Sequence, residues 1–87
     1  MAVLTPTSVL RESKGSTYLH IATFSDIDNG DTYVSGLSGI VGCWVSPTDD
    51  PTTTTLTSID TTISSGTITF YTGEDNRTGK LYIETTQ

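Results

Sequence analysis

Residues 56–86 read LTSIDTTISSGTITFYTGEDNRTGKLYIETT and contain the clearest structural pattern in the chain. Apolar and polar residues alternate in three short runs, 56–63, 67–72 and 80–86, as in strands with one buried face. Ser65 and Gly66 supply a turn between the first two runs. The alternation directs one set of side chains inward: Ile68, Phe70, Leu81 and Ile83. We expect the last two strands to pair as an antiparallel hairpin.

The rest of the chain continues the same pattern of short strands and polar turns. Residues 17–25 alternate with apolar groups on both faces, which favours a central strand. Residues 39–45 are the most apolar run, and we expect a second central strand there, with a bulge or close approach at its glycines. Further segments are a strand at 7–12, a strand or helical turn at 33–37, and a polar connection at 46–55. The fold class predicted is all-β: a compact single-domain antiparallel β-sandwich or small barrel of about six to seven short strands.

The composition indicates a domain with a thin core. Serine and threonine supply 29 of the 87 residues, whereas valine, isoleucine, leucine and phenylalanine supply only 20. A chain of this size buries only about 60% of its unfolded surface. We therefore expect one domain, residues 1–87, that gains stability from neighbours. Residues 1–8, which include Pro6, are expected to form an extended N-terminal arm.

Charge and cysteine content exclude several classes of protein. Ten carboxylates and four basic residues give a formal charge of −6, which disfavours nucleic-acid binding and suits a more basic protein partner. The single cysteine, Cys43, cannot form an intrachain disulfide and is expected to be a small buried hydrophobe. The start of the chain lacks the features of a signal peptide, and no apolar run is long enough to span a membrane. We expect a protein that folds in a cytoplasm and does not associate with membranes.

The acidic stretch 26–32, DIDNGDT, is the one candidate metal site. Asp26, Asp28 and Asp31 are weak candidate ligands for a hard cation such as calcium. The spacing differs from that of an EF-hand, since no glutamate follows at the position that would complete one. Aspartate, asparagine and glycine are also the commonest turn residues, so we favour a turn and predict neither a metal nor a cofactor.

Nothing in the sequence indicates catalysis. The only histidine, His20, lies on a predicted strand without a serine or cysteine nucleophile at motif spacing, so we expect a packed or interfacial side chain and no enzyme activity. Asn76–Thr78 matches a glycosylation sequon but is interpreted as loop sequence. The aromatic residues are open to three interpretations, namely cross-strand pairing, protein contact and sugar stacking. They are Tyr18, Tyr33, Trp44, Tyr71 and Tyr82.

The runs HIATFSDIDNGDTYVSGLSGIVGCWVSPT (20–48) and GTITFYTGEDNRTGKLYIETT (66–86) resemble the small Thr-rich structural proteins of tailed bacteriophage virions, particularly capsid decoration (cement) proteins. The resemblance covers most of the chain and is one of general character, because the chain is short, acidic, all-β and without an active site. It implies a virion protein that binds the outer surface of an icosahedral head, stabilises it and acts as a homo-oligomer. The implied partner is the major capsid protein or another virion protein, and the implied location is the virion.

The residues expected to make the contacts are in the arm and on the last two strands. Ala2, Val3, Leu4 and Val9 come first, with Tyr71 and Tyr82 expected close together on the outside of one hairpin. Deletion of residues 2–8 is expected to abolish particle binding and leave the fold intact. Two alternative functions stay open: a phage tail, collar or connector component, and a carbohydrate-binding or adhesin-type β module.

Overall fold

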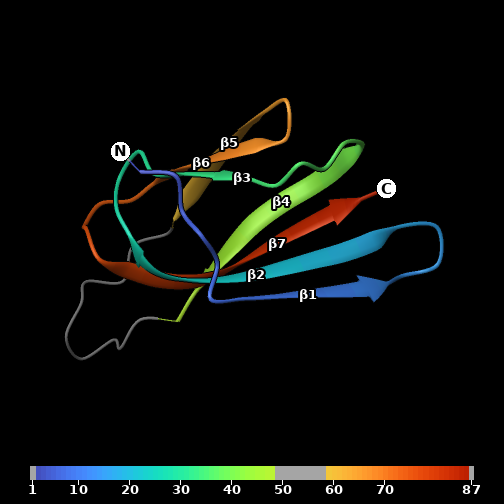
Figure 1. Ribbon diagram of the computed structural model, residues 1–87, viewed down its shortest axis with the longest axis horizontal. Helices are drawn as coiled ribbons and strands as arrows, with labels where there is room; N and C mark the ends of the chain where they lie inside the picture. The colour runs from blue at the N-terminus through green and yellow to red at the C-terminus, as the bar shows by residue number, and fades with distance from the viewer. Residues whose placement is uncertain (1, 49–58, 87) are drawn as a thin grey trace.

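The computed structural model describes residues 2–48 and 59–86, and within them the protein is all-β. Two antiparallel sheets pack against each other, a four-stranded sheet in the order β1-β2-β7-β4 and a three-stranded sheet in the order β3-β6-β5 (Figure 1). The predicted fold class is thereby confirmed. The strands are β1 (Ser8–Ser13), β2 (Tyr18–Ile27), β3 (Thr32–Val34), β4 (Ile40–Pro47), β5 (Asp60–Ser64), β6 (Thr67–Tyr71) and β7 (Arg77–Thr85).

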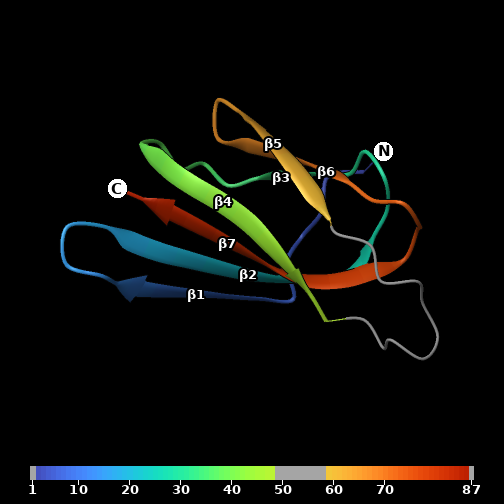
Figure 2. The ribbon, with the colours of Figure 1, turned by 180° about the vertical axis from the view of Figure 1, so that it is seen from behind.

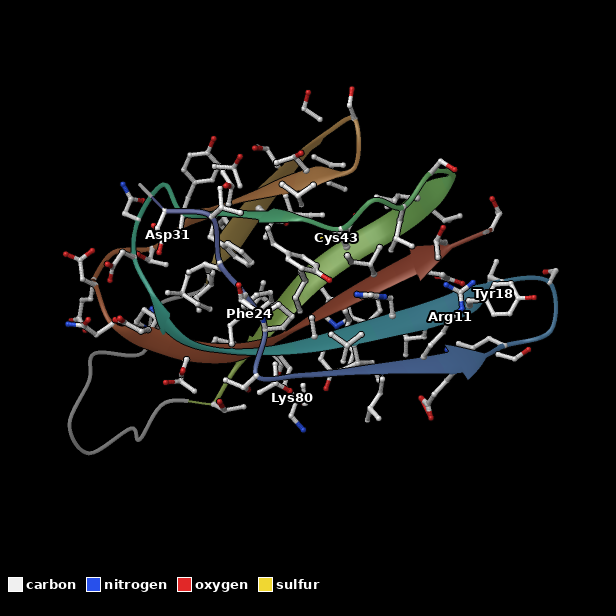
Figure 3. All side chains as sticks on the ribbon, viewed as in Figure 1. Arg11, Tyr18, Phe24, Asp31, Cys43 and Lys80 are labelled. Atoms are coloured by element: carbon white, nitrogen blue, oxygen red, sulfur yellow. The ribbon has the colours of Figure 1, made fainter. Side chains whose placement is uncertain are left out.

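The core lies between the sheets and is built from the alternating apolar residues. Phe24 of β2 points into the space between the two layers (Figure 3) and meets the Phe70 ring edge-on, with ring centroids 5.4 Å apart. Such edge-to-face pairs add to the free energy of apolar burial. All four side chains expected to point inward are fully buried: Ile68, Phe70, Leu81 and Ile83.

Of the two strands expected to be central, one is confirmed and one is wrong. β2 lies between β1 and β7, as predicted. β4 is an edge strand of the four-stranded sheet. A register shift between Ile40 and Gly42 lets Ile40 pack against the core together with Cys43 and Val45, while Val41 and Trp44 are exposed. The predicted bulge at the glycines is thus confirmed.

The expected pairing of the last two strands is wrong. β6 pairs with β3 and β5, whereas β7 pairs with β2 and β4 in the other sheet. Alternation shows which side chains point inward, but two strands whose side chains point into the same core can belong to one sheet or to two opposed sheets. The hairpin in this part of the chain is β5–β6, joined by Ser65 (φ 51) and Gly66 (φ 81). Two successive positive φ values are those of a type I′ turn, which matches the twist of the strands it joins.

The first described residues lie along the three-stranded sheet and do not extend from the domain (Figures 1 and 2). Val3 forms a parallel bridge with Thr32, and the Leu4 amide donates to the Thr32 carbonyl at 2.7 Å. Leu4 packs against the core. The 33–37 segment forms a strand only as far as Val34, and β4 extends to Pro47, within the predicted connection. Most of that connection, and the start of the predicted strand 56–63, fall outside the described residues.

Candidate docking surface

A row of apolar side chains crosses the outer face of the four-stranded sheet. Its members are register partners on successive strands: Leu10 pairs with Ile21, Ile21 with Tyr82, and Tyr82 with Trp44. Directly opposed residues of neighbouring strands point to the same face, so the four side chains stand in a line. We call Leu10, Ile21, Tyr82 and Trp44 the apolar row. With strands about 4.8 Å apart, it spans about 14 Å between its outer strands.

The two ends of the row are exposed and its middle is half-buried. Leu10 has 62% of its surface exposed and Trp44 has 47%, while Ile21 and Tyr82 are half-buried. The Trp44 and Tyr82 rings stack nearly parallel, at an interplanar angle of 7° with centroids 5.3 Å apart. The alternation of β4 beyond its bulge sets this arrangement, because it turns Cys43 and Val45 toward the core and leaves Trp44 outside. The result is a rigid pair of aromatic rings on an open surface.

Polar residues flank the row on both sides. One neighbouring register line joins Thr23, Lys80 and Ser46, and Lys80 points away from the three-stranded sheet in Figure 3. The other line runs from Glu12 through Leu19 and Glu84 to Gly42, so its polar members are the two glutamates, and the Glu84 carboxylate accepts from the Thr17 hydroxyl at 3.0 Å. An apolar centre with a polar rim is the arrangement found at protein interfaces.

No other described element covers this face. The three-stranded sheet packs on the opposite face of the four-stranded sheet in both ribbon views (Figures 1 and 2). The outer face of the three-stranded sheet has a different character, because it presents mainly hydroxyl side chains, which water solvates well. They include Thr32, Thr62, Ser64, Thr67 and Thr69, and the two exposed apolar residues on this face, Val34 and Tyr71, lie on different register lines. The two outer surfaces therefore differ, one apolar at its centre and the other polar.

The residues expected to make contacts do not form one surface. Tyr82 belongs to the apolar row, but Tyr71 lies on β6 in the other sheet, with its hydroxyl 3.3 Å from that of Thr62. The expectation that the two tyrosines share a hairpin is wrong. Val9 lies on β1 and is 46% exposed, on the opposite face from Leu10. Leu10 and Ile21 were not predicted from the sequence, because their alternation was visible but their cross-strand register was not.

Ala2, Val3 and Leu4 serve contacts within the domain. The Ala2 amide donates to Asp31 Oδ1 at 2.9 Å, and the Ala2 carbonyl accepts from the Thr32 amide at 2.9 Å. Leu4 is half-buried against the core. Ala2 and Val3 are both exposed, and Val3 has 70% of its surface accessible, so only Leu4 of the three is turned toward the core.

The acidic stretch is organised by hydrogen bonds to the backbone. Asp31 is buried, and its second oxygen accepts from the Asp28 amide at 2.9 Å. Asp28 in turn accepts from the Asn76 amide at 2.8 Å, which ties this loop to the start of β7. Asp26 is exposed and adopts a left-handed conformation with φ 63. Among residues 2–48 and 59–86, no three acidic, histidine or cysteine side chains gather closely enough to hold a metal ion.

His20 is buried against Tyr33. Its Nε2 lies 2.9 Å from the Tyr33 hydroxyl, and the two rings stack with centroids 6.1 Å apart. Burial lowers the pKa of His20, with a further contribution from the positive charge of Arg11 across the β1–β2 pair. Burial likewise raises the pKa of Tyr33. The neutral imidazole therefore serves as a packed hydrogen-bonding group.

Two open grooves lie next to β5. One, of about 480 Å³, runs between β4 and β5 and is lined by Cys43, Trp44 and Asp60 among others. Burial raises the pKa of Cys43, and its Sγ lies 3.8 Å from the Thr61 hydroxyl. A thiol with a raised pKa is a weak nucleophile at neutral pH. The other groove, of about 450 Å³, is lined by Leu37, Ile40 and Ile63 together with small residues.

We compared the chain with protein-family models, with curated proteins and with solved structures, and none of them matches it. In the part of the chain that the structure describes, no helix is long and apolar enough to cross a membrane.

Proposed function

We propose that this protein is a structural component of a bacteriophage virion, a decoration protein that binds the outside of the head through its apolar row. The observation that carries the proposal is the line of Leu10, Ile21, Tyr82 and Trp44 on a sheet face that no other described element covers. An apolar centre with stacked aromatic rings is suited to fill a shallow complementary surface on a protein partner.

The difference between the two outer faces orients the domain on the shell. The four-stranded sheet faces the capsid, and the hydroxyl-rich face of the three-stranded sheet stays in water. The thin core supports the same role, since only nine hydrophobic side chains among the described residues are buried. Binding that requires the folded domain adds to its stability by mass action. The head and the domain thus stabilise each other.

The setting on a head rests on the resemblance to virion proteins, and the same surface would serve in a tail, collar or connector. That location would place the protein in a ring of few copies instead of over the whole shell. Counting copies per particle by quantitative mass spectrometry separates the two.

The second candidate function is carbohydrate binding, which the stacked Trp44 and Tyr82 rings favour. Exposed aromatic rings stack on the apolar faces of sugars, and Trp44 is 47% exposed at the edge of its sheet. Glycan binding by the isolated domain, lost on substitution of Trp44, would support this function. It would also count against the proposed decoration role.

The test of the leading proposal is binding to purified heads that lack the protein. Trp44→Ala should weaken binding at least about 30-fold, since an anchor residue contributes about 2 kcal/mol or more and each 1.4 kcal/mol is tenfold. Tyr71→Ala is the matched control, because Tyr71 is also an aromatic residue, 45% exposed, on the other sheet. It should bind as the unaltered protein does. Equal binding by all three proteins would refute the proposed surface.

A further inference from the structure

β1 is an open edge of the four-stranded sheet. Every residue of Ser8–Ser13 is exposed, and the strand pairs with β2 in unbroken register. It contains no proline, glycine or bulge, which are among the features that prevent an edge from pairing with another chain, and its only charged residues are Arg11 and Glu12. The opposite edge of the sheet, β4, has a register shift and ends in Pro47, and β5 packs beside it. Figures 1 and 2 show no described element alongside the outer side of β1.

We propose that β1 pairs with β1 of a second copy of this chain, antiparallel about a twofold axis, to form one continuous eight-stranded sheet. Such an axis stands perpendicular to the sheet and keeps both outer faces on the same side. Residues that lie opposite each other across the two copies must then point to the same face. This allows only registers in which one residue of β1 lies opposite the same residue of the second copy, on which the register is centred.

The residues of β1 select one of these registers. When Leu10 lies opposite Leu10 of the second copy, Ser8 faces Glu12, a hydroxyl donor opposite a carboxylate acceptor, and this occurs twice. On the other face Val9 lies opposite the aliphatic stem of Arg11. A register centred on Arg11 would place two guanidinium groups opposite each other, which is destabilising. A register centred on Val9 would place Leu10 opposite Ser8 and leave the Glu12 end of the strand without a partner.

The backbone pattern fits the Leu10-centred register. The Lys14 amide donates to the Thr17 carbonyl at 2.7 Å, so Lys14 and Thr17 form a hydrogen-bonded pair. Every second residue of β1 counted back from Lys14, including Leu10, therefore exchanges backbone hydrogen bonds with β2. Val9 and Ser13 are out of phase and direct their backbone groups toward the open edge. The Leu10 pair is then a non-hydrogen-bonded pair, whose Cα atoms lie about 4.5 Å apart.

Charge and apolar surface both favour a second copy as the occupant. The chain has a formal charge of −6, but residues 8–17 carry Arg11 and Lys14 against Glu12, a local charge of +1. Contact along β1 therefore brings together segments that lack the acidic charge of the chain as a whole. The pairing also joins two apolar rows into one line of eight side chains, about 34 Å long between its outer strands. A surface of this length gives each dimer two anchors on a partner.

Cysteine cross-linking tests both the pairing and its register. In a Cys43→Ser background, Leu10→Cys should form an intermolecular disulfide on mild oxidation, because the expected Cα separation lies within the range of disulfides. Glu12→Cys is the matched control on the same face, and its thiol lies opposite Ser8 instead of its own copy. Cross-linking at position 12 as readily as at position 10 would overturn the register.

Sedimentation equilibrium tests the dimer without any substitution in the row. Strand pairing alone buries a small interface, so we expect a dissociation constant on the order of micromolar. Val9→Pro removes a donor at the open edge and should give a monomer with an unchanged circular dichroism spectrum, while Val9→Ala should still dimerise. A 9.3 kDa monomer at hundreds of micromolar, with no cross-link at position 10, would overturn the proposal. Trp44→Ala should dimerise normally, so failure of head binding and failure of dimerisation are distinguishable.

Discussion

Replacement of Asp31 by asparagine should destabilise the domain strongly, although the two side chains have almost the same shape. Each carboxylate oxygen of Asp31 accepts a backbone amide, from Ala2 and from Asp28, both at 2.9 Å, and the side chain is only 3% exposed. In Asp31→Asn one acceptor becomes an NH₂ donor that faces an N–H donor. The variant also loses the negative charge that strengthens the remaining hydrogen bond.

The expected loss follows from these two contacts. A hydrogen bond to a charged group contributes about 1.5–3 kcal/mol, and leaving a buried donor without an acceptor costs about 1–3 kcal/mol. Since these two quantities overlap, we expect Asp31→Asn to lower the free energy of unfolding by about 2–4 kcal/mol. A domain of this size loses about 4–8 °C of melting temperature per kcal/mol, so the fall should be at least about 8 °C.

Urea denaturation followed by tryptophan fluorescence measures this change through Trp44, the only tryptophan. Asp26→Asn is the control, because Asp26 is an exposed aspartate in the same loop and asparagine tolerates its left-handed conformation. It should change stability by less than about 0.5 kcal/mol. Equal effects of the two substitutions would refute the capping role of Asp31. So would a stability of the unaltered protein that rises steeply with calcium and a loss of that rise in Asp31→Asn, since the two together would make Asp31 a metal ligand.

Two further predictions concern the β5–β6 turn and the histidine. Gly66→Ala should cost about 2–4 kcal/mol of stability, because the added Cβ would lie 2.7 Å from the Leu37 carbonyl oxygen at a φ of 81. The control is Gly15→Ala, which has the same φ but open space around it and should cost only the backbone strain. Equal losses of stability in thermal melts of the two variants would contradict the clash. Because burial lowers the pKa of His20 in the folded state, the unfolding free energy should be constant above about pH 7.5 and fall as the pH drops through about 6.5 toward the folded-state pKa. His20→Gln should remove this dependence between about pH 7.5 and 5.5, a range in which carboxylates scarcely titrate; a slope that persists in the variant would show that another group is responsible.

Much of the fold was predictable because strand alternation is a local property. The inward set at Ile68, Phe70, Leu81 and Ile83 follows from a period of two, and the Ser65–Gly66 turn follows from residue types that accept positive φ. The edge position of β4 was not predictable, since its run of apolar residues is equally compatible with two covered faces. The assignment of the last two strands to different sheets depends on the long-range pairing of β7 with β2 and β4.

The candidate site shows the same division. Tyr82 and Trp44 were visible as aromatic residues on alternating strands, but their stacking requires β4 and β7 to pair in one register. Leu10 and Ile21 join them only through two further registers. No single stretch of sequence contains the row, because each strand contributes one member.

The order of amino acids alone specifies the class of this protein, a small acidic all-β domain whose side-chain alternation assigns residues to an inner or an outer face. That assignment is local, since successive side chains of a strand point to opposite sides. The packed sheets are needed to establish which strands are neighbours, which edge stays open, and why Asp31 is buried despite its charge. These features depend on contacts between residues far apart in the chain, and those contacts contribute to stability only when the two sheets have packed together.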